Sequence, residues 1–352
     1  MKRTKLRPGS LYLILILAAL PTLQGCYYMQ AVGGHTHVMN QRRPMADVIS
    51  DPASSETLRE RLRLVQEARE FSVEVMKLPD NDSYRSYADL GRDYVVWNVF
   101  AAPEFSLQPK EWCYLVVGCV AYRGYFAKED AMQEARELER DGYDVSVAGV
   151  SAYSTLGQFA DPVLNTMMRW SDADLVATLF HELAHQKLYV KGATQFNESF
   201  ASAVAEIGME RWLPSRGSGA SLEAYRRSQA LQHKLLEIVE AAKVELTEIY
   251  EAGSDVDEKR RRKDKVMHEL SADAARLFAE AGAGSSPLGA PLNNARLVSL
   301  GLYESWVPAF IAVFEECSRD IDCFYRRSRN LADLAPDERS ARLELLANAG
   351  AS

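Results

Sequence analysis

The chain has 352 residues, enough to bury a large core in one big domain or in two closely packed ones. Its 49 acidic residues outnumber its 41 basic residues, so the formal net charge is −8 at pH 7. Nucleic-acid binding depends on basic groups that neutralise phosphates, so this composition argues against a nucleic-acid partner.

The first 25 residues predict a secretory signal peptide. They begin with four basic residues, Lys2, Arg3, Lys5 and Arg7. The apolar run that follows over 11–20 is too short to span a membrane comfortably and is typical of a signal peptide. The segment ends in Leu23-Gln24-Gly25-Cys26, which resembles the lipobox of bacterial lipoproteins.

The lipobox-like ending predicts a lipid anchor at Cys26. By that resemblance, cleavage precedes Cys26, and several acyl chains at the new terminus anchor the protein stably. Tyr27 follows, where an inner-membrane retention signal has an aspartate. We therefore expect a protein of the bacterial cell envelope, anchored in the outer membrane and facing the periplasm. An ordinary signal peptide or a membrane anchor is the alternative, against which the Leu-x-Gly-Cys ending argues.

The other four cysteines form two close pairs with equal spacing. Four cysteines allow three pairings, and an oxidising periplasm favours disulfides between near neighbours. We therefore expect the disulfides Cys113–Cys119 and Cys317–Cys323. A zinc site made of four cysteines is the alternative, which this spacing does not favour.

The region before the most informative motif predicts a tether and a small β-containing half. Residues 26–54 are interpreted as a tether that contains some local structure, and their His35-Thr36-His37 pair as linker rather than metal ligands. The elements expected after it are a charged helix over 56–77, β-rich runs over 94–100 and 114–120, a helix over 128–141 and a strand over 143–150. Strand 145–150 is expected at a sheet edge, where an extended peptide could add to it.

The most informative motif is His181-Glu182-Leu183-Ala184-His185. On a helix, histidines at i and i+4 project from one face and can share a metal ion. Glu182 lies beside that face, where a carboxylate can take a proton from metal-bound water as a general base. We therefore predict that His181 and His185 bind Zn²⁺ and that Glu182 is catalytic.

The surroundings of the motif favour a buried helix over about 172–190. Ser171 and Asp174 form a start that resembles a capping box, and Gly192 fits a helix stop. A second segment that begins with His268-Glu269 lacks the second histidine and lies in a charged helical stretch. It is interpreted as a solvated helix face.

Glu198 is the predicted third metal ligand. Thr194 or Asn197 could cap a helix that runs to about Trp212, which places Glu198 in its first turn. A His₂Glu set leaves the fourth zinc position open for water or substrate. The alternative is a carboxylate that only stabilises the helix N-terminus. Glu206, two turns further on, is expected either to support the ring N–H of a ligand histidine or to be a surface residue.

Residues 214–352 are predicted to be a helical region. Charged helical patterns over 222–253 and 256–281 predict an antiparallel hairpin, and the remainder from Asn293 on is expected to be helical. Residues 55–213 form the expected catalytic region. The predicted fold is therefore α+β and predominantly helical, with the order of elements that zincin-like metallopeptidases require.

An ordered run of motifs extends over most of the mature chain. It comprises residues 117–126, 142–145, 152–157, 161–165, 180–186, 196–201 and 211–213. This run resembles the bacterial family of predicted lipoprotein aminopeptidases, which are gluzincin-like metallopeptidases, and it implies a zinc-dependent aminopeptidase. The sequence departs from the family at Lys191-Gly192-Ala193-Thr194, where the family tends to be acidic, and at Ala205, where a glutamate is expected. Neither departure touches the predicted ligands.

These features together predict metal-assisted hydrolysis of peptide bonds. Zn²⁺ lowers the pKa of its water and polarises the scissile carbonyl, and Glu182 passes the proton to the leaving amine. The developing oxyanion needs a second donor, for which Tyr153 is the first candidate, ahead of Tyr122 and Tyr125. An aminopeptidase also needs a carboxylate for the substrate ammonium, which the sequence does not identify. A zinc endopeptidase of the cell envelope and a non-catalytic lipid-anchored scaffold are the alternatives.

Overall fold

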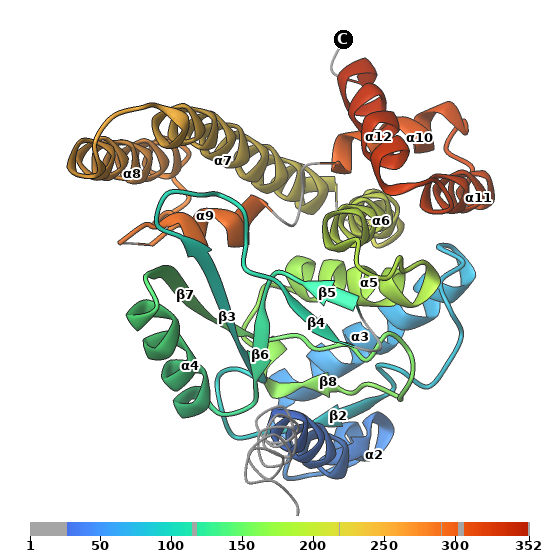
Figure 1. Ribbon diagram of the computed structural model, residues 1–352. Helices are drawn as coiled ribbons and strands as arrows, with labels where there is room; N and C mark the ends of the chain where they lie inside the picture. Colours follow the sequence, from blue (N-terminus) through green and yellow to red (C-terminus); the bar gives the residue numbers. More distant parts are fainter. Residues whose placement is uncertain (1–26, 115–117, 218, 290, 302–305, 351–352) are drawn as a thin grey trace, which may run out of the picture.

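The computed structural model describes residues 27–114, 118–217, 219–289, 291–301 and 306–350 (Figure 1). Helices predominate within these residues, and the strands form small sheets, which confirms the predicted α+β, mostly helical class. The predicted signal peptide and Cys26 lie outside the described residues. No helix in the described part of the chain combines the length and the apolar character needed to cross a bilayer.

The N-terminal segment is folded, in contrast to the tether predicted over 26–54. Residues 27–40 are helical, and β1 (Arg42–Pro44) and α2 (Met45–Ser50) follow. The side chains that this segment contributes to the main core are Val38, Met45 and Val48. The tether prediction is therefore wrong for the described part of the segment.

The glycines of this segment concealed the helix from the sequence pattern. Gly34 packs so closely on Phe126 that a Cβ at position 34 would overlap the aromatic ring. Tyr27 stacks on Tyr114, and the Arg123 guanidinium lies 4.2 Å from the Tyr27 ring centroid. Close packing of a helix on neighbouring elements thus compensates for the low helix propensity of glycine.

Small sheets occupy the N-terminal half. One has the strand order β1-β2-β8, with β2 at Ser86–Ala88 and β8 at Val163–Leu164. Another has the order β6-β3-β7 and is antiparallel, with β6 at Arg123–Tyr125, β3 at Val96–Pro103 and β7 at Tyr143–Val150. The strand predicted at a sheet edge is therefore β7, and it does lie at an edge. Helix α4 (Lys128–Arg140) packs against this sheet through a separate small apolar cluster.

The β-rich run predicted over 114–120 contributes to two short paired strands. β4 (Trp112–Tyr114) pairs antiparallel with β5 (Gly118–Val120), and 115–117 lie outside the described residues. Gly118 has a φ of +83°, a left-handed conformation that glycine adopts without strain. A disulfide joins Cys113 and Cys119, which are opposite each other in the hairpin.

The helices form the rest of the molecule. Helix α3 (Glu56–Glu74) begins at Ser55, whose hydroxyl accepts a hydrogen bond from the Leu58 N–H. Beyond α5 (Asp172–Lys187) and α6 (Thr194–Ser215), the helices are α7 (Gly219–Glu251), α8 (Val256–Glu280), α9 (Asn294–Gly301), α10 (Val307–Glu316), α11 (Ile321–Ala332) and α12 (Pro336–Gly350). The Cys317–Cys323 disulfide joins the end of α10 to α11.

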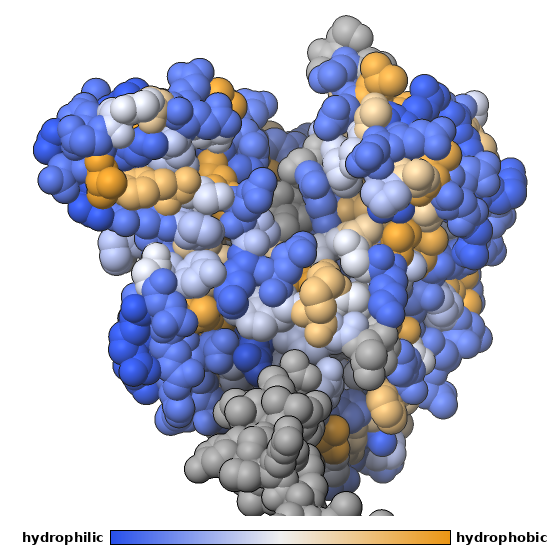
Figure 2. All heavy atoms as spheres, in the orientation of Figure 1, coloured by the Kyte–Doolittle hydropathy of each residue, from blue (hydrophilic) through white to orange (hydrophobic). Residues whose placement is uncertain are grey.

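The buried apolar residues do not divide at the predicted boundary after residue 213. The main core joins α3, α5 and α6 to α10, α11 and α12, so the C-terminal helices belong to the same core as the central helices (Figure 1). The antiparallel α7–α8 hairpin has its own apolar cluster with α9. Its outer surface is mostly hydrophilic in Figure 2, as the charged sequence pattern predicts.

Candidate metal centre

Helix α5 is fixed by its cap and its buried stripe. The Ser171 hydroxyl accepts a hydrogen bond from the Asp174 N–H at 3.1 Å, which satisfies one of the free N–H groups of the first turn. Leu175, Leu179 and Leu183 recur at i, i+4 and i+8 and are at most 1% exposed. The helix ends at Lys187, three residues before the predicted end, because Leu188 is extended. The opposite side of the helix is then left to carry the polar motif.

Helix α6 is joined to α5 by a short turn that an asparagine side chain closes. Asn197 is 1% exposed, and its amide both accepts from the Val190 N–H at 2.7 Å and donates to the Val190 carbonyl at 2.8 Å. The helix begins at Thr194 after Ala193, which makes no side-chain cap, so neither Thr194 nor Asn197 caps it as predicted. Asn197 instead fixes the position of the next residue, Glu198, above α5.

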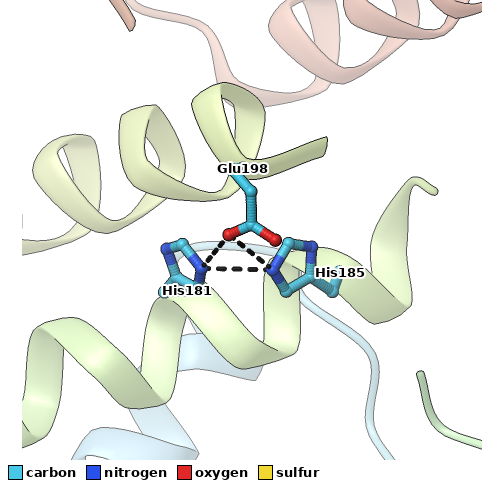
Figure 3. Close-up of side chains that lie close together, drawn as sticks. All are labelled: His181, His185 and Glu198. Carbon is cyan, nitrogen blue, oxygen red and sulfur yellow. Dashed lines mark hydrogen bonds and ion pairs between the residues drawn. The ribbon is translucent and has the colours of Figure 1, made fainter. Parts of the chain in front are cut away.

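The three predicted ligands meet between these helices. Figure 3 shows Glu198 reaching down from α6 toward both imidazoles of α5. Glu198 Oε2 lies 3.2 Å from His181 Nε2 and 3.6 Å from His185 Nε2, and the two Nε2 atoms are 3.1 Å apart. The ligand atoms all lie within 4.8 Å of one another.

These distances fit a tetrahedral metal ion. Bonds of about 2.0–2.1 Å to the corners of a tetrahedron place two ligand atoms about 3.3 Å apart. The observed separations of 3.1, 3.2 and 3.6 Å bracket that value. Two Nε2 atoms that face each other also need a cation or a proton between them, because two facing lone pairs would repel each other. The donor set of two imidazoles and one carboxylate could therefore hold a metal ion.

The electrostatics of the cluster favour a bound cation. Burial acts to raise the pKa of Glu198, but the His185 and His181 rings outweigh it and hold that pKa far below its ordinary value. Burial acts to lower the pKa of His185, but Glu198 and then Glu182 raise it above its ordinary value. Without a metal, the carboxylate therefore favours the protonated form of the neighbouring imidazole. A divalent cation would meet the same negative charge.

Glu182 lies beside the cluster and is partly buried. Burial raises its pKa, and the negative charge of Glu198 adds to the rise, whereas the two histidines oppose it. A raised pKa moves a carboxyl group toward the range in which it exchanges protons near neutral pH. The structure thus brings together His181, His185, Glu198 and Glu182, the four residues that the sequence singled out.

Two other predicted site residues have different partners. Glu206 Oε1 lies 3.5 Å from His233 Nε2 of α7, and His185 Nδ1 is buried without a partner among the described residues. Glu206 therefore does not support His185. The Tyr153 hydroxyl lies 3.1 Å from His35 Nδ1, so the histidine that was interpreted as linker contacts the predicted oxyanion donor.

The other candidate donors also have neighbours away from the metal ligands. Tyr125 donates a hydrogen bond to Glu134 Oε2 at 2.8 Å, and the Tyr122 ring lies 5.7 Å from that of Phe100.

A buried acid near Glu182 was not among the site residues predicted from the sequence. Asp161 is fully buried and accepts hydrogen bonds from the backbone N–H and the hydroxyl of Thr155. Burial raises the pKa of Asp161 to about 6, with a contribution from the Glu182 charge, although the Thr155 bonds oppose the rise. Only the folded arrangement reveals this proximity, because β8, a 3-10 turn over 165–167 and about three turns of α5 separate residues 161 and 182 in the sequence.

Comparison with known proteins places the chain in a family. A family model described as "Putative aminopeptidase" matches residues 26–343, a span that contains the whole candidate metal centre. No curated protein and no solved structure matches the chain. Because the matched span covers most of the sequence, the chain belongs to this aminopeptidase family, whose description indicates a peptidase.

Proposed function

We propose that the protein is a zinc-dependent peptidase, and specifically an aminopeptidase that removes N-terminal residues from peptides. The observation that carries the proposal is the cluster of His181, His185 and Glu198 at tetrahedral spacing, with Glu182 beside it, in a member of an aminopeptidase family. Structural zinc sites are normally closed by four protein ligands, whereas catalytic sites have three. The cluster has three, among the residues that the structure describes.

His181 Nε2, His185 Nε2 and Glu198 Oε would hold the zinc ion. When bound, zinc supplies Lewis-acid polarisation of the scissile carbonyl and lowers the pKa of a bound water. Glu182 accepts a proton from the attacking water and transfers it to the leaving amine, a task that suits a carboxyl group with a raised pKa. We further propose that an extended substrate adds to the edge strand β7 through main-chain hydrogen bonds.

We also propose that the protein is a lipoprotein of the outer membrane, anchored through Cys26 and facing the periplasm. The lipobox-like ending supports this, and the family match begins at residue 26, the predicted first residue of the mature chain. Two disulfides agree with an oxidising compartment. Metabolic labelling with a radioactive fatty acid tests the anchor, since Cys26→Ala should lose the label.

A peptide library in free and N-acetylated forms tests the activity. The purified protein is incubated with zinc and the library, products are read by mass spectrometry, and Glu182→Gln is the blank. Loss of single N-terminal residues from the free peptides alone supports the aminopeptidase proposal. Internal cuts in both forms would identify an endopeptidase instead. No cleavage above the blank would contradict the peptidase proposal and favour a scaffold.

A further inference from the structure

A second face of α5 adjoins the metal-binding face. Glu182 and Gln186 lie one turn apart on it. The Gln186 side-chain oxygen accepts a hydrogen bond from Asn81 Nδ2 at 2.7 Å. Gly157 also packs on Gln186, since a Cβ at position 157 would lie 3.1 Å from the same oxygen. Two segments distant in the sequence, around Asn81 and around Gly157, therefore cover the face that holds Glu182.

The segment around Asn81 is fixed by a buried guanidinium. Arg69 is 1% exposed and donates to the backbone carbonyls of Pro79 at 2.8 Å, Asn81 at 2.9 Å and Ser83 at 3.1 Å. Hydrogen bonds to a charged donor are stronger than neutral ones. This network therefore determines the path of the chain into the next residue, Tyr84.

Tyr84 has two properties that are costly for a folded protein. Its φ is +60°, in the left-handed region that bulky side chains seldom adopt. Its side chain is buried, and its hydroxyl has no hydrogen-bond partner among the described residues. An unsatisfied buried hydroxyl destabilises the folded state. Strained and unsatisfied groups of this kind concentrate at functional sites.

Two acidic side chains, and more weakly the Arg69 guanidinium, act electrostatically on the Tyr84 hydroxyl. The Tyr84 N–H donates to the Asp161 carbonyl at 2.6 Å, which joins the two segments that cover α5. Burial raises the pKa of Tyr84, and the negative charges of Glu182 and then Asp161 raise it further. Ser154 is close enough to lower that pKa, but the two hydroxyls do not have the geometry of a hydrogen bond. The hydroxyl thus remains a protonated donor beside a carboxylate.

We propose that Tyr84 is a positioning residue for Glu182, whose carboxylate receives a hydrogen bond from the Tyr84 hydroxyl during catalysis. One carboxylate oxygen would be held by Tyr84, and the other would face the attacking water. A base whose rotation is restricted in this way spends more time in the productive orientation. The inference rests on the proposed peptidase function, in which Glu182 is the base.

The variant Tyr84→Phe tests the proposal, because it removes only the hydroxyl. We expect kcat to fall by about 10- to 100-fold, the effect typical of residues that orient a site, with little change in KM and in zinc content. The melting temperature should stay the same or rise, because the lost hydroxyl has no partner in the fold. Tyr325→Phe is the matched control. Its hydroxyl donates to the Met76 carbonyl at 2.8 Å, so this variant should melt earlier and keep its kcat.

A second variant, Ser154→Ala, tests whether the Tyr84 hydroxyl acts through the neighbouring Ser154 hydroxyl instead of through Glu182. Under the proposal, Ser154→Ala should keep the wild-type kcat. The inference is overturned if Tyr84→Phe loses less than tenfold in kcat, loses zinc or melts earlier. It is also overturned if Ser154→Ala reproduces the kcat loss. Wild-type protein without peptidase activity would overturn the proposed function and this inference together, whereas active wild type with an unaffected Tyr84→Phe overturns the inference alone.

Discussion

Helices α5 and α8 contain the same tripeptide, His-Glu-Leu, and the structure uses it in opposite ways. The leucine has one role in both, since Leu183 is 0% exposed and Leu270 is 2% exposed. In α8 the preceding His268 and Glu269 are exposed, and Glu269 lies 3.8 Å from Lys265 as a surface ion pair. In α5 the corresponding His181 and Glu182 are partly buried.

The difference arises from what covers each helix. Helix α8 packs on α7 along one side, and its other side meets water. Helix α5 packs on the main core along one side, and α6 and the segments around Asn81 and Gly157 cover the other. Exclusion of water is what lets neighbouring charges shift a pKa strongly. The shifted pKa of Glu182 in α5 therefore depends on the elements that cover the helix, namely α6 and the segments around Asn81 and Gly157. No comparable elements cover the exposed side of α8 within the described residues.

Removal of one histidine from each helix should give the largest difference between α5 and α8. Under the proposed function, His185→Ala removes one of three ligands, so we expect the protein to lose stoichiometric zinc and all peptidase activity. His268→Ala should retain both. Metal content after dialysis, measured by mass spectrometry, checks the expectation. Stoichiometric zinc in the His185→Ala protein would show that the ligand assignment is wrong.

Removal of the two glutamates separates metal binding from catalysis. Glu182→Gln should lower kcat by about 10²- to 10⁴-fold, the contribution of a general base, while zinc remains bound because Glu182 is not a ligand. Glu269→Gln should change neither. Steady-state kinetics on the best peptide of the library, together with metal analysis, measures the effect. An active Glu182→Gln protein would contradict the proposed mechanism.

Burial near α5 also predicts a dependence of stability on pH. The pKa of Asp161 is about 6 in the folded protein against 3.8 ordinarily, so the folded state binds this proton more tightly than the unfolded state. The stabilisation is present below pH 3.8 and is lost as the pH rises through about 6. A shift of about two units corresponds to about 3 kcal/mol.

The variant Asp161→Asn isolates this effect because it cannot titrate. Its stability relative to wild type should increase by about 2 kcal/mol between pH 4 and pH 7, on top of a pH-independent offset from the altered Thr155 bonds. Urea unfolding at several pH values, with a chelator to keep both proteins free of metal, measures the difference. A difference that stays constant with pH would refute the shift, and Glu269→Gln on exposed α8 serves as control.

The sequence predicted that His181, His185 and Glu198 lie together because the geometry of this cluster is local. Two histidines at i and i+4 share a face of any α-helix. The short connection between Lys187 and Thr194 restricts where Glu198, in the first turns of α6, can lie relative to α5. The helix boundaries were within a few residues of those observed, since the cap at Ser171 and the buried leucines are also local signals. The α7–α8 hairpin was predictable for the same reason.

The surroundings of the site were not predictable, because they depend on contacts between distant segments. Tyr84 approaches α5 through a strained backbone that no sequence pattern marks. Tyr153 pairs with His35 from a segment interpreted as a tether. Of the two roles that the sequence left open for Glu206, the structure favours the one away from the metal ligands, since two turns of α6 carry its side chain toward His233 of α7. Helical spacing gives the face of a residue only approximately, and packing of the next helix decides its partner.

Substitution of Glu206 should have the smallest effect, and its size distinguishes support of a ligand histidine from a contact with α7 alone. If it supported a ligand histidine, Glu206→Gln would weaken zinc affinity or activity by about 10- to 100-fold. The structure instead pairs it with His233, whose side chain is 44% exposed. Surface ion pairs contribute at most about 1 kcal/mol, so Glu206→Gln should keep its zinc and its kcat and lose little stability. A tenfold loss of zinc affinity of Glu206→Gln in a competition titration would contradict this expectation. It would show that α6 supports the predicted ligands through Glu206 as well as through Glu198.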